Sequence, residues 1–537
     1  MTPTTWEKVP YDEIPDLKRL SDYVRWYAEQ KPNAEACVDF EGRRLTYLEL
    51  KDEVEKQSMR LRKLGVAQGD ILALLSPPCV EFWIFFLATI DVGATFLGLN
   101  PRYTENELRY AIDKANPKLI LICEQIDDTA YDKHISALKA STDKPERVVP
   151  YELGSLNPTL EKLDDIVGNG ASSSSTDQIA DHCLLVFTSG TTGQPKGALL
   201  SEEGLVYCSR VHIHHMGKRP PLSGAALNPF PINHVACVGD VGATCLIGGG
   251  KMVFMHFEPV DLLRAIEQEK ITGFGGIPTM LQLILSVEEA KTTDFSSIER
   301  ILWGGAPMPR PLGQILQMLG RPLHTFYGLT ETTGNVTFTD PDASLDDCIE
   351  TIGKADPHHE VRIADANTDE VVSLGKTGEI QVKSPGNLKG YLNDPEATKA
   401  TFTEDGFLKT GDLGYQREDG AFVLNGRIKE MFKSGGYNVY PREVEAAIEQ
   451  LNGVAMACVV PVPDPVFHEV GFAYLVPSGM GDLELDAVKD QLRDYLANYK
   501  IPKYFEISLE PPILANGKLD RVTFKKSAVE QVKELSP

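Results

Sequence analysis

Short apolar runs alternate along the chain with amphipathic segments. Three of these runs predict buried β-strands: "DILALLS" at 70–76, "PKLILICE" at 117–124 and "HCLLVFTSG" at 182–190. Nearly continuous apolar runs are typical of strands that are covered on both faces. Between them, "ENELRYAIDKA" from Glu105 has its apolar residues at helical spacing. The alternation predicts an α/β fold with largely parallel sheets.

The most apolar stretch is "FWIFFLATIDVGATFLGLN" at 82–100, which Asp91 interrupts after nine residues. A membrane-spanning helix needs about 20 apolar residues, so the stretch predicts a buried helix that leads into a strand. We expect no stable membrane insertion.

The pattern changes near residue 427. Before it come β-rich stretches dense in glycine, such as "KTGEIQVKSPGNLKGYL". After it, the strands "AMACVVPVPD" and "VGFAYLVP" separate two amphipathic helices, "YPREVEAAIEQL" and "ELDAVKDQLRDYLANY". We expect an N-terminal domain over 1–428 and a small α+β domain over 429–537, because a segment of this length can form its own core.

Composition narrows the possible partners. The chain has 537 residues and a net charge of -24, so its surface repels nucleic acid and anionic membranes at long range. Nine cysteines without a CxxC pair indicate reduced, mostly buried thiols, and the N-terminus shows no signal-peptide pattern. We therefore expect a cytoplasmic protein without nucleic-acid partners. The composition is compatible with a monomer or a homodimer.

The segment "FTSGTTGQPKGAL" at 187–199 has the glycines, hydroxyls and lysine of a phosphate-binding loop. It is not a Walker A loop, because Pro195 replaces the second glycine and Gly197 replaces the final Ser/Thr. It follows a predicted strand and precedes a predicted helix that begins near Ser201. A flexible Gly/Ser linker is the alternative interpretation.

The segment "HIHH" places His212 and His215 on one face of that helix, with His214 beside them. We do not expect a metal site here, since no HExxH pattern or carboxylate partner at ligand spacing accompanies them.

Four further motifs follow in order: "YGLTE" at 327–331, "TGDLG" at 410–414, "GRIKEMFKSGGYNVYPREVE" from Gly426 and "NGKLDR" at 516–521. With the segment at 187–199, they resemble the core motifs of the adenylate-forming superfamily. Its members include acyl-CoA synthetases, aryl-CoA ligases, luciferases and peptide-synthetase adenylation domains. The resemblance extends from "LTYLEL" at 45–50 to Lys518. It implies a large N-terminal domain of packed sheets and helices and a small mobile C-terminal domain.

The activity that the resemblance implies is that of an AMP-forming acyl-CoA synthetase, with ATP, Mg²⁺ and coenzyme A. A small-molecule carboxylic acid would be activated to an acyl-adenylate and transferred to the thiol. Three alternatives stay open: a luciferase-like oxidase, a stand-alone enzyme that loads a carrier protein, and a non-catalytic acyl- or nucleotide-binding protein. The intact motif residues argue against the last.

The resemblance also implies roles for individual residues. The loop over the phosphates would comprise Thr188, Ser189, Gly190, Thr191, Thr192, Gly193 and Lys196. Glu331 would bind magnesium together with Thr188, and Thr330 would lie at the α-phosphate. The adenine pocket would comprise Gly305, Ala306, Pro307, Tyr327 and Gly328. Asp412 would bind the ribose hydroxyls, and Arg427 would support that region.

The remaining roles concern the two half-reactions. Lys518 would stabilise the charge that develops in adenylation, and His234 would lie between the acyl pocket and the thiol tunnel. Lys429 would be the hinge of the C-terminal domain. Rotation there would bring Lys433, Gly435 and Gly436 to the coenzyme A site.

The acyl pocket implied by motif position consists of small or apolar residues: Val235, Val238, Gly239, Gly276, Ile277, Trp303, Gly328, Thr333 and Asn335. We expect an uncharged substrate tail, and a short, medium-length, cyclic or aromatic acid if Trp303 closes the pocket floor. His234 occupies the region where peptide synthetases place an aspartate for a substrate amine, with Asp240 as a weak alternative. This favours a free-standing coenzyme A ligase.

Overall fold

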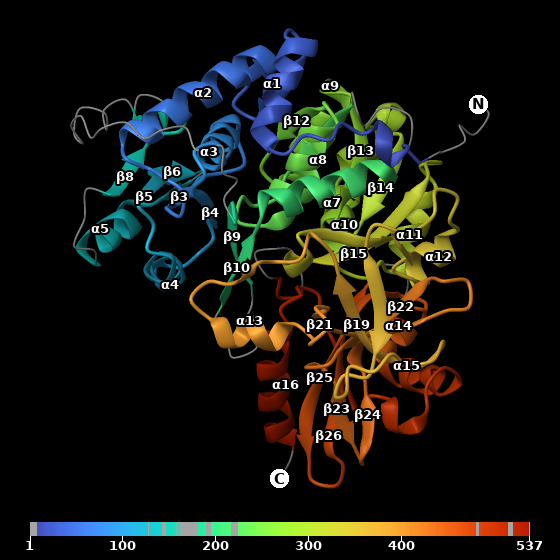
Figure 1. Cartoon of the computed structure of the whole chain (residues 1–537). Coiled ribbons are helices and arrows are strands. Elements are labelled where there is room, and N and C mark those ends of the chain that lie inside the picture. Colours follow the sequence, from blue (N-terminus) through green and yellow to red (C-terminus); the bar gives the residue numbers. More distant parts are fainter. Residues whose placement is uncertain are drawn as a thin grey trace.

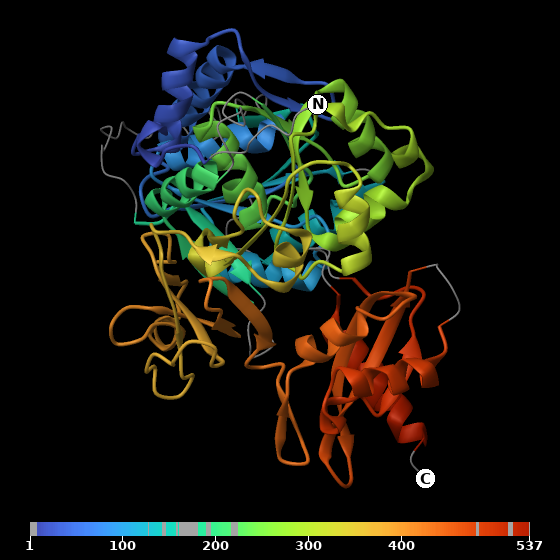
Figure 2. The same ribbon diagram turned by 90° about the vertical axis from the view of Figure 1, so that its right-hand side faces the viewer.

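The computed structural model describes residues 8–126, 128–141, 147–156, 159–160, 181–188, 195–215, 224–478, 483–513 and 519–535. The structure has two large mixed sheets, a four-stranded sheet and a separate C-terminal sheet, and the strands of the two large sheets alternate along the chain. Figures 1 and 2 show the C-terminal elements as a smaller lobe below the N-terminal sheets. The predicted fold class, a large α/β N-terminal domain with a small α+β C-terminal domain, is confirmed.

The first large sheet has the strand order β20-β10-β9-β4-β3-β5-β8. The bounds are β3 (Ile71–Leu75), β4 (Thr95–Leu99), β5 (Leu119–Cys123), β8 (Val148–Tyr151), β9 (Leu184–Thr188), β10 (Lys196–Leu200) and β20 (Gly390–Tyr391). Strands β3, β4, β5, β8 and β9 pair in parallel. Strands β3, β5 and β9 are the three predicted apolar runs, which confirms them.

Strand β10 was not predicted from the sequence. It precedes the helix predicted near Ser201 and pairs antiparallel with β9. The apolar residues of β10 pair with those of β9, for example Leu199 with Leu185. Strands β9 and β10 therefore form a β-hairpin, and Lys196 begins its return strand. A short apolar run without clear alternation does not distinguish a strand from the first turn of a helix.

Helices α1 (Leu20–Gln30), α2 (Tyr47–Lys63), α3 (Val80–Asp91), α4 (Glu105–Ala115) and α5 (Asp132–Ser141) accompany this sheet. Every residue of α3 is buried. As predicted, this apolar helix leads into strand β4, and the two contribute Phe82, Phe86 and Phe96 to the main core. Among the described residues, no helix is long and apolar enough to cross a membrane. All nine cysteines are buried and free.

The second large sheet has the strand order β17-β16-β15-β14-β13-β11-β12-β1-β2. Its strands are β1 (Glu35–Asp39), β2 (Arg44–Thr46), β11 (Ala225–Asn228), β12 (Lys251–Phe254), β13 (Ile271–Gly276), β14 (Arg300–Trp303), β15 (Leu323–Leu329), β16 (Gly334–Phe338) and β17 (Lys354–Ala355). Its helices are α7 (Glu202–His215), the π-helix η3 (Ala236–Ala243), α8 (Thr244–Ile247), α9 (Pro259–Gln268), α10 (Pro278–Ser286), α11 (Arg310–Gln317) and α12 (Leu345–Glu350). Helix α7 crosses between the two large sheets (Figure 1).

The third sheet is antiparallel, with β18 (Glu360–Ala364), β19 (Gly378–Lys383), β21 (Leu408–Gln416) and β22 (Phe422–Arg427), and α13 (Pro395–Thr401) precedes β21. The C-terminal sheet has β23 (Phe432–Ser434), β24 (Tyr437–Val439), β25 (Val454–Asp464), β26 (His468–Pro477) and β27 (Tyr504–Ile507). Its helices are α14 (Pro441–Ile448), α15 (Leu485–Gln491) and α16 (Arg521–Leu535). Helix α15 is shorter than predicted, because the chain tightens into 3-10 turns after Gln491.

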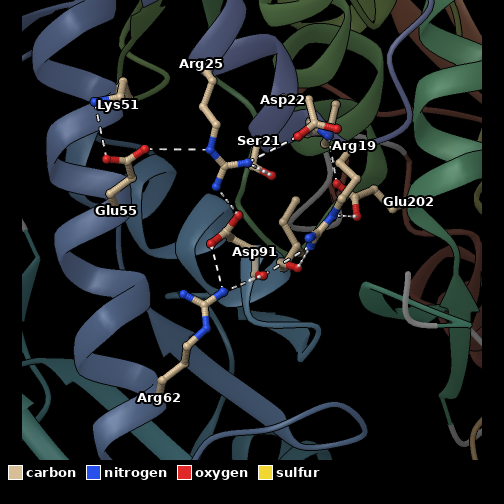
Figure 3. A network of polar contacts seen from close by, with 11 residues as sticks. Arg19, Ser21, Asp22, Arg25, Lys51, Glu55, Arg62, Asp91 and Glu202 are labelled. Atoms are coloured by element: carbon tan, nitrogen blue, oxygen red, sulfur yellow. Dashed lines mark hydrogen bonds and ion pairs between the residues drawn. The ribbon is translucent and has the colours of Figure 1, made fainter. Parts of the chain in front are cut away.

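A buried carboxylate ties the outer helices to α3 (Figure 3). Asp91 ends α3, and its side chain is 4% exposed. Arg25 of α1 contacts the carboxylate at 2.6 Å, and Arg62 of α2 contacts it at 3.2 Å. Burial alone would raise the pKa of Asp91, but its ion pairs, above all with Arg25, hold that pKa below its usual range. The charge that interrupts the most apolar stretch is therefore structural.

We expect Asp91→Asn to lower the free energy of unfolding by about 2 kcal/mol, because two arginines lose their charged partner. Thermal unfolding followed by fluorescence measures the loss. Asp52→Asn is the matched control, since that carboxylate is 63% exposed and pairs with Lys51 at the surface. The control should change stability by less than about 0.5 kcal/mol. Equal losses in both variants would contradict the structural role of Asp91.

Candidate active site

The hairpin of β9 and β10 meets two residues from distant parts of the chain. Thr188 lies opposite Lys196 in the hairpin register. The Thr188 hydroxyl donates to Glu331 Oε1 at 3.3 Å, and the Tyr391 hydroxyl donates to the same oxygen at 2.9 Å. Lys196 Nζ lies 5.1 Å from the centroid of the Tyr391 ring. A carboxylate, two hydroxyls and an ammonium group thus lie close together at Thr188 and Lys196, the last paired residues before the hairpin turn.

The tip of the hairpin lies outside the described residues. The predicted phosphate-loop residues there are Ser189, Gly190, Thr191, Thr192 and Gly193. Tyr391 was missed by the sequence analysis. It lies on β20, which pairs with β10, and no motif marked it.

Glu331 lies in the 3-10 turn Thr330–Thr332, between β15 and β16. The turn is tightly held, because the Thr332 hydroxyl donates to the carbonyl of Gly334 at 2.7 Å and Leu388 N donates to the carbonyl of Glu331 at 2.8 Å. A Cβ at Gly328 would lie 2.2 Å from the Gly334 carbonyl oxygen, so β15 and β16 approach as closely as they do only with glycine there.

Tyr327, Asp412 and Arg427 form a second group. The Tyr327 hydroxyl donates to Asp412 Oδ2 at 2.7 Å, and Arg427 Nε contacts Asp412 Oδ1 at 2.9 Å. Asp412 and Arg427 are paired neighbours on β21 and β22. The charge of Asp412 raises the pKa of Arg427, and burial raises the pKa of Tyr327 well above its usual value. The group fixes an anionic carboxylate beside an aromatic ring and an arginine.

Lys429 follows the end of β22, where the chain leaves the third sheet. Partial burial lowers its pKa, and repulsion from Lys196 and Arg427 lowers it further. Lys196 and Arg427 are therefore close enough to repel Lys429, and Glu331 has the opposite effect on the pKa of Lys429. An anion such as a phosphate would reduce this repulsion.

The C-terminal lobe carries the predicted thiol loop. Lys433 lies on β23, and Gly435 and Gly436 turn the chain into β24. Both glycines have positive φ, 56° and 89°, a region that favours glycine. Gly435 N donates to the Phe467 carbonyl at 2.9 Å. Lys518 lies outside the described residues.

The predicted acyl residues lie partly on the π-helix η3, which the sequence analysis did not predict. His234 precedes it, and Ala236 N donates to His234 Nδ1 at 3.1 Å. A Cβ at Gly239 would lie 3.2 Å from Leu205 Cδ2 and 3.4 Å from the Thr333 carbonyl oxygen. The helix therefore packs closely against the segment after Glu331, with Val235, Val238, Gly239, Thr333 and Asn335 all buried. π-helices occur often at functional sites.

The remaining predicted residues lie at the ends of neighbouring parallel strands. Gly276 and Trp303 pair in register at the ends of β13 and β14. Ile277 precedes α10, while Gly305, Ala306 and Pro307 follow β14, with Gly305 at φ 73°. Trp303 is 1% exposed and packs in the core cluster that includes residues of α9, α10 and α11. Its role as a pocket floor stays a prediction.

A histidine of α7 contacts a carboxylate that is far from it in the sequence. His215 Nε2 contacts Asp356 Oδ2 at 2.6 Å, and His358 Nδ1 contacts Asp356 Oδ1 at 2.7 Å. Potential ligand atoms of His214, His215 and Asp356 lie within 4.8 Å of one another. The sequence analysis missed this carboxylate because it is 141 residues away from His215. Hydrogen bonds from His215 and His358 hold the pKa of Asp356 well below its usual range, although burial alone would raise it.

Two models of known domains match the chain. The model of the AMP-binding enzyme matches residues 24–392, and that of the AMP-binding enzyme C-terminal domain matches residues 443–518. Thr188, Lys196 and Glu331 lie within the first match, and Lys518 ends the second. The resemblance indicated by the motifs is confirmed.

Two relatives match nearly the full chain. A protein named feruloyl-CoA synthase from an Amycolatopsis species is 34% identical over 495 residues, which are 92% of this chain and 95% of that protein. The acyl-CoA ligase sidI of Aspergillus fumigatus is 31% identical over 534 residues, covering 91% of this chain and 87% of that protein.

Two solved structures share the fold. ATP-bound MatB from Rhodopseudomonas palustris has a TM-score of 0.82 at 27% identity, covering 95% of this chain and 99% of that chain. The anthranilate CoA ligase AuaEII in complex with anthranoyl-AMP has a TM-score of 0.85 at 20% identity, covering 98% of this chain and 100% of that chain. The second likeness concerns the fold alone.

Stability should depend on pH through His359, whose side chain donates to or accepts from Ser384 Oγ at 2.8 Å. Burial lowers the pKa of His359 to about 4. Below about pH 6.5 the unfolded chain therefore takes up a proton that the folded protein does not, which costs up to about 1.4 kcal/mol per pH unit down to about pH 4.

We expect His359→Gln to lose less stability than the wild type when the pH falls from about 7 to about 5. The melting temperature of both proteins, measured at each pH, gives the two differences. An equal fall in melting temperature for the two proteins would contradict the lowered pKa of His359.

Proposed function

Because this chain belongs to the family of AMP-binding enzymes, we propose that it is an AMP-forming acyl-CoA synthetase. It would activate a carboxylic acid with ATP, releasing pyrophosphate, and transfer the acyl group from the adenylate to coenzyme A. The acid–CoA ligase class is also the class named for the relatives described above.

The observation that carries the proposal is the convergence of two groups on one segment, 327–331. Its first residue, Tyr327, contacts Asp412, and its last, Glu331, contacts Thr188 and Tyr391. A nucleotide needs one environment for its base and ribose and another for its phosphates. The base and ribose need an aromatic ring and a hydrogen-bond acceptor, and the phosphates need cations and hydroxyls.

The residues around Glu331 would act on the phosphates. Lys196 and the hydroxyl of Thr188 would bind oxygens of the β- and γ-phosphates, with the rest of the loop 188–193 closing over them. The Glu331 carboxylate suits Mg²⁺, because hard oxygen ligands shared with phosphates are typical of that ion. When bound, Mg²⁺ neutralises charge on the phosphates. Thr330 would lie beside the α-phosphate.

The nucleoside end would be held by the second group. The Asp412 carboxylate accepts a hydrogen bond from Tyr327 and forms an ion pair with Arg427, and these contacts fix its orientation. It would also accept hydrogen bonds from the ribose hydroxyls. Tyr327 would stack on the adenine ring, with Gly305, Ala306, Pro307 and Gly328 around it. Arg427 would support the ribose and the α-phosphate.

The two half-reactions would use different positions of the C-terminal domain, 429–537, relative to the N-terminal domain, 1–428. In the first, Lys518 would stabilise charge between the attacking carboxylate and the α-phosphate. Rotation about Lys429 would then bring Lys433, Gly435 and Gly436 to the active site for the thiol. His234 would lie between the acyl and thiol channels.

The acid would be short, medium-length, cyclic or aromatic, with Val235, Val238, Gly239, Gly276, Ile277, Thr333 and Asn335 around its tail and Trp303 beneath them. Relatives named for feruloyl-CoA and for other acyl-CoA products are compatible with that range. Coenzyme A is favoured over a carrier protein because the relatives are named as CoA ligases.

The direct test is to incubate the protein with ATP, Mg²⁺ and a panel of carboxylic acids, with and without coenzyme A. AMP, pyrophosphate and thioester should appear only with certain acids. ADP in place of AMP, or no pyrophosphate with any acid, would contradict the proposal.

Lys518→Ala should reduce adenylation by several powers of ten, at about 1.36 kcal/mol per tenfold change, while leaving thioester formation from preformed adenylate largely intact. Lys525→Ala is the matched control, because Lys525 is exposed on α16, close to Lys518 in the sequence. Pyrophosphate release and thioester formation are measured separately. Equal loss in both half-reactions would contradict the assigned role of Lys518.

Tyr327→Phe should raise the KM for ATP about tenfold, because Asp412 loses a hydrogen bond worth about 1.5 kcal/mol that orients it. The KM for the acid should change much less. Tyr495→Phe, at a residue 55% exposed, is the control. A rise confined to the KM for the acid would place Tyr327 outside the nucleotide site.

A further inference from the structure

Asp240 has no role in the function proposed above, yet it lies in the same turn of η3 as Val238 and Gly239. The following inference rests on that function and concerns the acyl part of the substrate. Asp240 Oδ1 accepts a long hydrogen bond of 3.4 Å from Asn335 Nδ2 and lies 4.0 Å from His212 Nε2. No cationic side chain contacts its carboxylate among the described residues.

The Asp240 side chain is partly accessible beside buried neighbours. It is 21% exposed, whereas His212 beside it is 2% exposed and Val238 and Gly239 are buried. Asp240 therefore lies among the residues proposed above to surround the acyl group, with part of its carboxyl still accessible. Burial raises the pKa of Asp240 to about 7, and burial is the only cause of that shift.

Neither His212 nor Asn335 supplies a positive charge to the Asp240 carboxyl. Burial lowers the pKa of His212 to about 3, so the imidazole is neutral near pH 7. His212 Nε2 lies 2.6 Å from Asn335 Nδ2, so the asparagine amide is shared between His212 and Asp240. A buried carboxyl with one weak, shared donor retains most of its capacity to accept hydrogen bonds.

A second polar group in the same region has unused hydrogen-bonding capacity. Thr333 Oγ1 is buried without a hydrogen-bond partner among the described residues. Thr333 also has φ 61°, a left-handed conformation that is strained for a β-branched residue. Its backbone contacts the position of Gly239, next to Asp240. Leaving buried polar groups unsatisfied costs about 1–3 kcal/mol each, and a ligand that pairs with them removes that cost.

We propose that Asp240 is a specificity-determining residue, which accepts a hydrogen bond from a hydroxyl group on the acyl part of the substrate acid. Asn335 orients the carboxyl for this contact. The preferred substrates are then acids whose uncharged tail carries a hydroxyl group, and the acyl site has a specific polar contact in addition to the small or apolar residues expected from the sequence.

The test compares pairs of acids that differ by one group: phenylpropanoic acid with its para-hydroxy and para-amino derivatives, and hexanoic acid with its terminal hydroxy derivative. In the wild type, kcat/KM for pyrophosphate release should be about 10- to 100-fold higher for at least one hydroxylated acid than for its parent. A preference for the amino derivative alone would overturn the assignment of a hydroxyl and indicate an amino group as the hydrogen-bond donor.

Asp240→Ala should abolish the preference between hydroxylated acid and parent, whereas Asp240→Asn, which keeps one acceptor oxygen and the same shape, should retain part of it. Asp261→Asn, at an exposed carboxylate of α9, is the control and should keep the full preference. Melting temperatures show whether each variant is folded, and the asparagine variant decides the question if the alanine variant is not.

The experiments distinguish a wrong role for Asp240 from a wrong proposed function. If the wild type releases pyrophosphate with the parent acids but shows no preference for any hydroxylated one, or if the preference survives in Asp240→Ala, the role of Asp240 is wrong and the proposed function stands. If no acid releases pyrophosphate with the wild type, the proposed function itself is wrong.

Discussion

Gly328 has no room for a side chain, because a Cβ there would lie 2.2 Å from the Gly334 carbonyl oxygen. This close approach of β15 and β16 sets the geometry of the whole candidate site. Before the turn, Tyr327 reaches Asp412 of the third sheet. In the turn, Glu331 reaches Thr188 and Tyr391 of the first sheet. After it, Asn335 reaches His212 and Asp240. One strand–turn–strand unit thus carries or contacts the residues proposed to bind the nucleoside, phosphate and acyl parts of the substrates.

The helices and strands that follow from the local pattern of apolar residues could be predicted from the sequence. Strands β3, β5 and β9 are apolar because both faces are covered, and α3 is apolar because every residue is buried. The order of the motifs also identified the segments that carry Thr188, Glu331 and Asp412. These features depend on a residue's neighbours in sequence, or on short motifs whose residues lie in one segment.

The features that the sequence analysis missed depend on contacts across the fold. Tyr391 meets Glu331 from 60 residues away, because β20 pairs with the edge of β10. Asp356 meets His215 from 141 residues away. The π-helix η3 has no distinct sequence period, and only its glycines, among them Gly239 and Gly242, hint at close packing. Such contacts are set by the order and register of strands, which one sequence does not specify.

The charge distribution explains how an acidic protein can bind anions. The net charge of -24 repels a nucleotide at long range, but repulsion of this kind is screened within about 10 Å at ordinary salt. Inside the site, Lys196 and Arg427 both repel Lys429. Asp412 pairs with Arg427, and Glu331 offsets part of the repulsion at Lys429. Burial is the largest cause of the lowered pKa of Lys429, and repulsion from Lys196 and Arg427 lowers it further. In the proposed reaction, a bound phosphate would reduce that repulsion. The departure of pyrophosphate would restore the repulsion at the proposed hinge.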